Sequence, residues 1–113
     1  MTSTTDRIEQ RPEISFVVHG DVEATSIEYA TKRLETVLDQ IGAPVLFVQA
    51  KLTQAADPAR ERPARARATI DVNGDLVRGQ VRATTMTEAI DLLADRLRDQ
   101  LQHRSERRRA RRQ

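Results

Sequence analysis

The stretch RPARARATIDVNGDLVRGQVRA, residues 62–83, decides the fold of this chain. Two runs of alternating residues flank Asn73-Gly74. This dipeptide indicates a β-hairpin, because a type I′ turn needs a positive φ at both central residues. If Val72 pairs with Asp75, the register of both strands follows, since consecutive side chains of a strand point to opposite faces. The stretch therefore predicts a hairpin with two chemically different faces.

One predicted face of the hairpin is small and apolar, which leaves room for a helix to pack closely, and the other is basic. The apolar face holds the pairs Ile70–Val77, Ala68–Gly79 and Ala66–Val81. The basic face holds the pairs Thr69–Arg78, Arg67–Gln80 and Arg65–Arg82. Like charges directly opposite each other destabilise a sheet by about 0.2–1 kcal/mol. Two interpretations stay open: the arginines extend into water and guard the sheet against edge pairing, or they contact phosphates, which match the forked donors of Arg.

Upstream of the hairpin, the sequence predicts a strand, a helix and a second strand. The segment EISFVVHG places Ile14, Phe16 and Val18 on one side of the first strand. TSIE, beginning at Thr25, has the spacing of a capping box. A helical apolar stripe follows it, formed by Ala30, Leu34, Val37, Leu38 and Ile41. In the next strand, VLFVQAKLT, the residues expected to face inward are Leu46, Val48, Ala50 and Leu52.

The rest of the chain predicts a loop over 54–63, which we expect to be mobile, and a second helix after the hairpin. This helix begins with another capping box, TMTE, at Thr85. Its apolar stripe comprises Met86, Ala89, Ile90, Leu93, Leu97 and Leu101. Beyond Leu101 the stripe stops, and the arginines that follow either extend the helix or fray.

The expected fold class is α+β, a two-layer βαβββα domain. Each helix has a single apolar stripe, so both helices must cover one face of a four-stranded sheet. Residues 1–12 are expected to be a flexible N-terminal segment and 13–104 the folded domain. Residues 105–113 form a basic Arg-rich tail, expected to fray.

Charge is distributed unevenly over the 113 residues. The formal net charge is only +2, yet residues 96–113 hold eight arginines against Asp99 and Glu106. Such a basic segment indicates an anionic partner or, alternatively, a solubilising tail. The chain has no cysteine, no apolar run long enough to span a membrane and no secretory signal pattern. The expected location is the cytoplasm, with no membrane partner.

The sequence lacks the residue patterns of an enzyme or a metal site. His19 and His103 are far apart and lack neighbouring ligands; His103, among arginines, suits an accessory phosphate contact. The carboxylates Asp91, Asp95 and Asp99 have the spacing of a solvated helix face. No nucleophile elbow or phosphate-cradling glycine loop occurs. We therefore expect no catalysis, no cofactor, no metal and no small-molecule substrate.

Aromatic residues are too few for a base-stacking platform, since the chain has two phenylalanines and one tyrosine. Any nucleic-acid binding should then depend on the phosphate backbone and on shape, with a strong salt dependence.

The segment TIDVNGDLVRGQVRATTMTEAIDLLADRLRDQLQHRSER, residues 69–107, resembles the C-terminal half of the ribosome hibernation promoting factors, also called ribosome-associated inhibitors. YATKRLETVL, residues 29–38, resembles their first helix more loosely. The resemblance implies binding to small-subunit ribosomal RNA in the decoding region, where the domain blocks mRNA and tRNA access under stress. It also implies the same βαβββα fold, similar to double-stranded RNA-binding domains, and an action by steric occupation with charge neutralisation rather than catalysis.

By position, the resemblance implies RNA contacts at Arg33, Lys51 and Arg96, and at the basic helix end. Together with the basic face of the hairpin, the candidate RNA-binding residues are Arg33, Lys51, Arg65, Arg67, Arg78, Arg82, Arg96, Arg104, Arg107 and Arg108. Two surfaces are thus candidates for the RNA contact: the side of the domain that carries the helices, here called the helix side, and the basic face of the sheet.

Three alternatives stay open at this level. The chain could be a protein-interaction module of the same fold that no longer binds ribosomes, or a general binder of double-stranded RNA. The resembled family also has long forms with a second, dimerising domain. The chain is accordingly either a short form or the N-terminal part of a long form, and either a monomer or a dimer through that missing domain.

Overall fold

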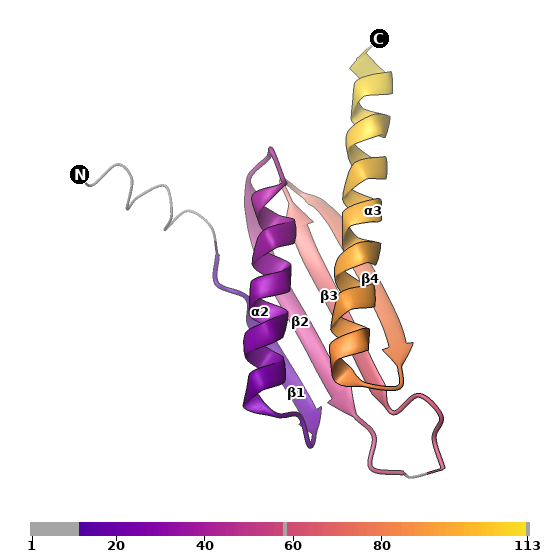
Figure 1. The fold of residues 1–113 in the computed structure, drawn as a ribbon. Helices are drawn as coiled ribbons and strands as arrows, with labels where there is room; N and C mark the ends of the chain where they lie inside the picture. Colours follow the sequence, from indigo (N-terminus) through magenta and orange to yellow (C-terminus); the bar gives the residue numbers. More distant parts are fainter. Residues whose placement is uncertain (1–11, 58, 113) are drawn as a thin grey trace, which may run out of the picture.

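The computed structural model describes residues 12–57 and 59–112. Its elements follow the order strand, helix, three strands, helix (Figure 1). They are β1 (Ser15–Gly20), α2 (Ala24–Asp39), β2 (Val45–Gln54), β3 (Ala64–Val72), β4 (Asp75–Ala83) and α3 (Met86–Arg112). The predicted α+β class and βαβββα order are confirmed. The predicted flexible segment lies, except for Pro12, outside the described residues.

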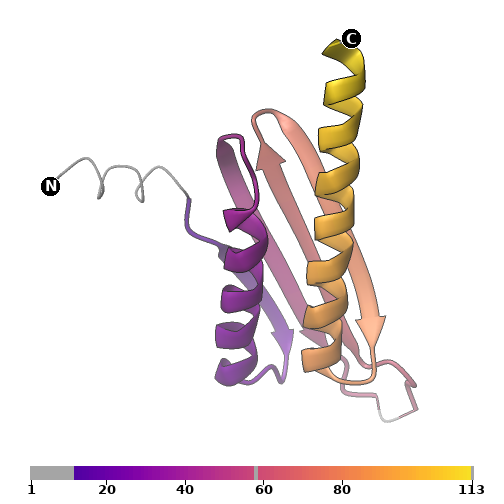
Figure 2. The same ribbon diagram turned by 45° about the horizontal axis from the view of Figure 1, so that its top comes forward.

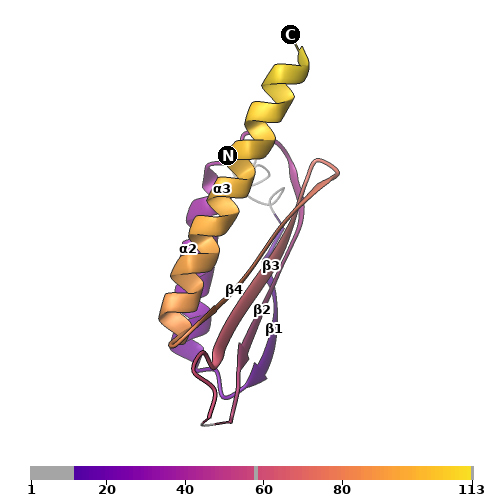
Figure 3. The same cartoon turned by 90° about the vertical axis from the view of Figure 1, so that its right-hand side faces the viewer.

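The four strands form one sheet in the order β1-β2-β3-β4. β1 and β2 are parallel, while the other two neighbouring pairs are antiparallel. Parallel neighbours need a crossover connection, and α2 supplies it. Figures 2 and 3 show α2 and α3 side by side on one face of the sheet, which leaves the opposite face uncovered. This two-layer arrangement is the predicted one.

The predicted hairpin register is confirmed residue by residue, from Val72 opposite Asp75 to Arg65 opposite Arg82. The turn has the backbone that its sequence requires, with φ of 51° at Asn73 and 96° at Gly74. The alternation of side chains therefore separates a buried face from an exposed one along both strands.

The core lies between the sheet and the two helices. Its largest fully buried side chains are Leu34, Val37, Val48, Leu52, Ile70, Val72, Ile90, Leu93 and Leu97. α3 approaches β4 closely at Gly79, where an added Cβ would lie 3.3 Å from the δ-carbons of Leu93 and Leu97. The expectation that small residues on β3 and β4 admit a helix is confirmed.

The two helix starts differ in how they are capped. At α3 the Glu88 N–H donates to the Thr85 hydroxyl over 3.2 Å, and the Glu88 carboxylate accepts from the Thr84 N–H over 3.1 Å. At α2 the predicted Thr25 cap is wrong. The helix already begins at Ala24, because the Glu23 carbonyl accepts from the backbone N–H groups of Ser26 and Ile27.

Two residues that were predicted to face the core are exposed in the structure. Leu46 is 57% exposed, because a bulge between Val45 and Phe47 shifts the register and places Val45 in the core instead. Val18 aligns with the buried Leu52 yet remains 38% exposed, since β1 is an edge strand of the sheet.

α3 does not end where the apolar stripe ends. Residues 105–112, which the sequence led us to expect as a frayed tail, continue the helix to Arg112. Arg, Glu and Ala are favourable helix residues, and the Gln102 amide donates to the Glu106 carboxylate one turn later, over 3.5 Å. The end of α3 extends past the β3–β4 turn (Figures 1 and 3).

Candidate nucleic-acid interface

A cluster of cations lies on the face of the sheet that the helices leave uncovered. Its members, here called the sheet-face cluster, are Lys51, Arg65, Arg67, Arg78 and Arg82. The strand register makes them neighbours: Lys51 aligns with Arg67, and Arg65 aligns with Arg82. Alternate residues of the same strands are buried, so these five side chains point away from the core.

The sheet-face cluster lacks counter-charges. None of its five side chains forms an ion pair or a hydrogen bond with a residue in the described ranges 12–57 and 59–112. An acidic side chain on the same face, Asp71, lies at the turn end and accepts a hydrogen bond from the Gly74 N–H over 2.9 Å. The cluster therefore offers fixed positive charge to an external anion.

The same face becomes apolar toward the hairpin turn. Phe47 aligns with Asp71, which aligns with Leu76 on β4. Phe47 and Leu76 are 44% and 53% exposed. The basic part of the face thus extends from Arg78, near the middle of the sheet, to the end next to the β2–β3 loop. In this loop Ala55 and Pro63 are joined by a backbone hydrogen bond of 2.8 Å.

Arg33, a candidate from α2, forms ion pairs with α3 and so joins the two helices. Its Nε lies 3.2 Å from Asp91 Oδ1, and one terminal nitrogen lies 3.7 Å from Asp95 Oδ1. This Nε atom is buried, and its contact with Asp91 is an ion pair without hydrogen-bond geometry. The Tyr29 hydroxyl also donates to Asp91 Oδ1. Two carboxylates from α3 thus already neutralise Arg33.

The hydrogen bond from Tyr29 to Asp91 changes the acidity of the phenol. The bond holds the proton on the hydroxyl, and partial burial and the negative charge of Asp91 act in the same direction, so the pKa of Tyr29 rises above its ordinary value of 10.0. Arg33 opposes this shift. Polar contacts of Tyr29 and Arg33 with carboxylates of α3 therefore join the two helices.

Arg104, a candidate from the basic end of α3, is almost completely buried. Its Nε donates to Asp75 Oδ2 over 3.1 Å, and a terminal nitrogen donates to the Val72 carbonyl over 3.1 Å. These bonds tie α3 to both ends of the hairpin turn. The sequence marked Arg104 as basic but had no signal for these partners, which are 29 and 32 residues away.

Arg96 is exposed on α3 and lines a groove of about 850 Å³ between α3 and the edge strand β4. Arg82, from the sheet-face cluster, lines the same groove, together with Arg62 and His103. The helix side and the sheet face thus adjoin along β4. Sequence reasoning missed Arg62, because only the fold brings the β2–β3 loop to this edge.

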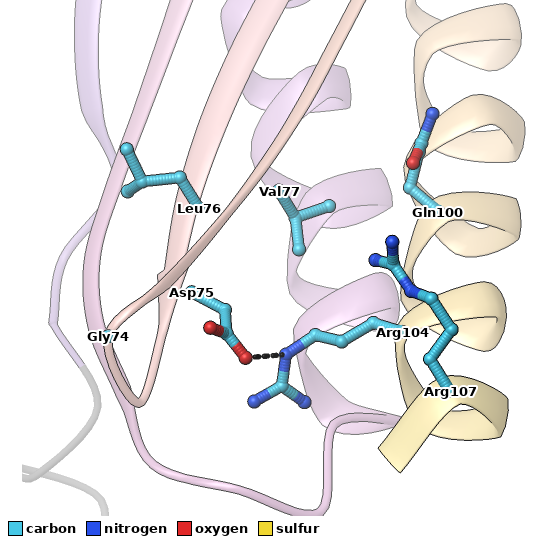
Figure 4. Close-up of a pocket in the computed structure, with 7 residues that line it drawn as sticks. All are labelled: Gly74, Asp75, Leu76, Val77, Gln100, Arg104 and Arg107. Carbon is cyan, nitrogen blue, oxygen red and sulfur yellow. Dashed lines mark hydrogen bonds and ion pairs between the residues drawn. The ribbon is translucent and has the colours of Figure 1, made fainter. Parts of the chain in front are cut away.

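Arg107 and Arg108 lie on the last turns of α3. Arg107 is exposed and, with Arg104, lines a second pocket beside the hairpin turn (Figure 4). For Arg108 the structure describes the helical backbone alone. Of the ten candidates, the structure gathers five on the sheet face and places Arg96 beside them.

Metal sites and membrane-spanning helices are both absent from the described residues. Residues 12–57 and 59–112 contain no group of three His, Cys, Asp or Glu side chains arranged to hold a metal ion. Within the same part of the chain, no helix has the length and apolar character needed to span a membrane.

Comparison with protein families identifies the relatives of this fold. The model of the family described as "Sigma 54 modulation protein / S30EA ribosomal protein" matches residues 13–109. The chain belongs to this family. The S30EA family is a family of ribosome-associated proteins, in agreement with the resemblance found on residues 69–107. A search of curated protein sequences finds no match.

Solved structures confirm the S30EA fold. The N-terminal domain of Protein Y from Thermus thermophilus matches with a TM-score of 0.65 and 22% identity, over 81% of this chain and 98% of that domain. A ribosomal subunit interface protein from Coxiella burnetii matches with a TM-score of 0.65 and 16% identity, over 82% of this chain and 97% of the other. Both likenesses establish the fold.

Proposed function

We propose that this chain is a ribosome hibernation factor. It binds ribosomal RNA of the small subunit in the decoding region and thereby blocks access of mRNA and tRNA under stress. The observation that carries the proposal is the sheet-face cluster, whose five cations lack partners among the described residues. Membership in a ribosome-associated family supports the ribosome as the source of the complementary anion.

The mechanism is occupation of space combined with charge neutralisation. Arg presents forked N–H donors that match two phosphate oxygens, whereas Lys51 acts as a point charge. Such contacts position a protein on RNA without reading its sequence. Selectivity for the ribosome then comes from the shape of the RNA surface that fits the sheet face and the adjoining groove. The proposed action needs neither cofactor nor catalysis, and it takes place in the cytoplasm, where ribosomes are.

A salt series measures this mechanism directly. Each neutralised phosphate contributes about −0.7 to −0.9 to the slope of log K against log[salt]. Five contacts therefore predict a slope near −4, which is roughly a 250-fold loss of affinity between about 50 and 200 mM salt. A protein that docks through apolar contacts would show a much smaller slope.

The test is co-sedimentation of the purified chain with small subunits and intact ribosomes on sucrose gradients at two salt concentrations. We expect the chain to migrate with both particles at low salt and to resist competition by bulk duplex RNA. Release by duplex RNA would indicate a general double-stranded RNA binder instead. If the chain stayed at the top of the gradient at low salt, ribosome binding would be excluded and a protein-interaction role would replace it.

A further inference from the structure

The β3–β4 turn and the last turns of α3 enclose a pocket of about 290 Å³, here called the junction pocket. Figure 4 shows its polar lining, which consists of Asp75 from the hairpin and Gln100, Arg104 and Arg107 from α3. One water takes about 30 Å³ in the liquid, so the pocket has room for a tetrahedral oxyanion with several waters. It lies at the end of the hairpin opposite the basic part of the sheet face.

Arg104 is held rigidly in this pocket. Its two bonds, to the Asp75 carboxylate and to the Val72 carbonyl, fix the plane of the guanidinium, and the Arg104 residue as a whole is only 9% exposed. A guanidinium carries five N–H donors, and these bonds use two of them. The remaining donors are oriented before any ligand arrives, which lowers the entropy cost of binding.

Arg107 supplies the second cation. It follows Arg104 by three residues, which places both on one side of the helix. In Figure 4 its guanidinium lies on the side of α3 that faces the hairpin. Arg107 forms no ion pair with a residue in the described part of the chain, whereas Asp75 already balances Arg104. The pocket therefore carries one uncompensated positive charge.

We propose that the junction pocket binds a phosphate group, held between Arg104 and Arg107. One uncompensated charge matches the single negative charge of a phosphodiester, and two guanidinium groups can share its tetrahedral oxygens. The expected source is an RNA backbone phosphate, and in that form the inference rests on the proposed function. The other source of the same chemistry is a free nucleotide.

Small probes test the pocket without a ribosome. The 15N-labelled chain is titrated with dimethyl phosphate, a phosphodiester monoanion, and separately with adenosine monophosphate, sodium acetate and sodium chloride. We expect saturable NMR shifts of the Arg104 and Arg107 Nε–H signals and of the Gly74 amide with dimethyl phosphate. The Arg107→Gln variant should lose them, while Arg98→Gln, an exposed arginine of α3 that pairs with Asp95, should keep them.

Two other outcomes of the titration would contradict the proposed ligand or replace it with another. Equal shifts with sodium chloride at the same ionic strength, or equal affinity for acetate, would overturn the phosphate assignment. Tenfold tighter binding of adenosine monophosphate than of dimethyl phosphate would retain the phosphate site but assign it to a free nucleotide.

Ribosome binding provides the second arm. Arg107→Gln should weaken co-sedimentation several-fold and make the salt slope about 0.7–0.9 less negative, whereas Arg98→Gln should leave both unchanged. Suppose that wild type sediments with ribosomes and that Arg107→Gln equals wild type in both the NMR titration and the co-sedimentation. Phosphate binding in the junction pocket is then refuted, while the proposed function survives. If wild type does not sediment but binds dimethyl phosphate, the proposed function fails and the pocket remains.

Discussion

Arg65 and Arg82 lie directly opposite each other on neighbouring antiparallel strands, on the face of the sheet that faces away from the helices. Neither side chain has a partner of opposite charge among the described residues. In the free protein this pair opposes folding, because like charges directly across a ladder repel. In a complex with RNA the same pair can face phosphates, so its cost in stability is compatible with a role in binding.

Replacement of Arg65 and Arg82 by uncharged residues should have opposite effects on stability and on ribosome binding. Arg82→Gln should raise the free energy of unfolding by about 0.2–1 kcal/mol, because the repulsion is removed. The double variant Arg65→Gln/Arg82→Gln should bind ribosomes more weakly, with a salt slope less negative by about 0.7–0.9 for each phosphate that the protein no longer neutralises. Urea unfolding and co-sedimentation over a salt series measure the two effects.

The helix side has its own variant for comparison, Arg96→Gln/Arg107→Gln, which leaves the buried Arg104 in place. If the sheet-face variant kept wild-type affinity while this helix-side variant bound ribosomes only weakly, the sheet face would not be the contact surface.

Arg104 should contribute more to stability than any exposed arginine of α3. Arg104→Met leaves the buried Val72 carbonyl without its donor and Asp75 without its counter-ion, which should cost about 1–3 kcal/mol of unfolding free energy. Arg98→Met, which removes an exposed pair with Asp95, should cost at most about 0.5 kcal/mol. Equal unfolding midpoints in urea for the two variants would contradict a structural role of Arg104.

Two glycines with positive φ should respond differently to alanine. Gly74→Ala meets no atom within 4 Å, so it should lose about 1–2 kcal/mol through backbone strain alone. Gly20→Ala adds a Cβ that overlaps the Gln54 carbonyl on β2, and this backbone cannot yield without breaking the pairing of Gly20 with Gln54. Its loss should exceed that of Gly74→Ala. Thermal unfolding of both variants checks the order, and a reversed order would disprove the close approach at Gly20.

The bond between Tyr29 and Asp91 predicts an alkaline weakening of the fold. Because the folded pKa of Tyr29 is raised, its contribution is fully present below the unfolded pKa near 10.0 and is lost as pH rises through the folded pKa. Tyr29 is the single tyrosine of the chain, so phenolate absorbance reports it alone.

We expect a titration midpoint above 10.0 in the folded chain and a lower one in urea. Asp91→Asn should bring the folded midpoint down, since it removes the carboxylate that accepts the bond. Identical midpoints in folded and unfolded wild type would show that the bond does not form in solution.

The hairpin could be predicted residue by residue because its determinants are local. Asn73-Gly74 specifies the turn, and strict alternation on both sides specifies which face is buried. The apolar stripes of α2 and α3 are local in the same sense, since helical periodicity places their members on one side. Leu46 was assigned to the wrong face because a bulge changes the alternation, and the run VLFV reads equally well in either register.

The sequence by itself determined the βαβββα order, the hairpin register and the presence of a basic sheet face, since period, turn chemistry and strand parity follow from neighbouring residues. Only the tertiary structure decided which arginines are available. Arg33 and Arg104 are as basic in the sequence as Arg82. The fold, however, brings Asp91 and Asp95 against Arg33 and Asp75 against Arg104. Arg82 has no counter-charge among the described residues. Counter-charges come from residues far along the chain, and their positions depend on how the two helices pack across the sheet.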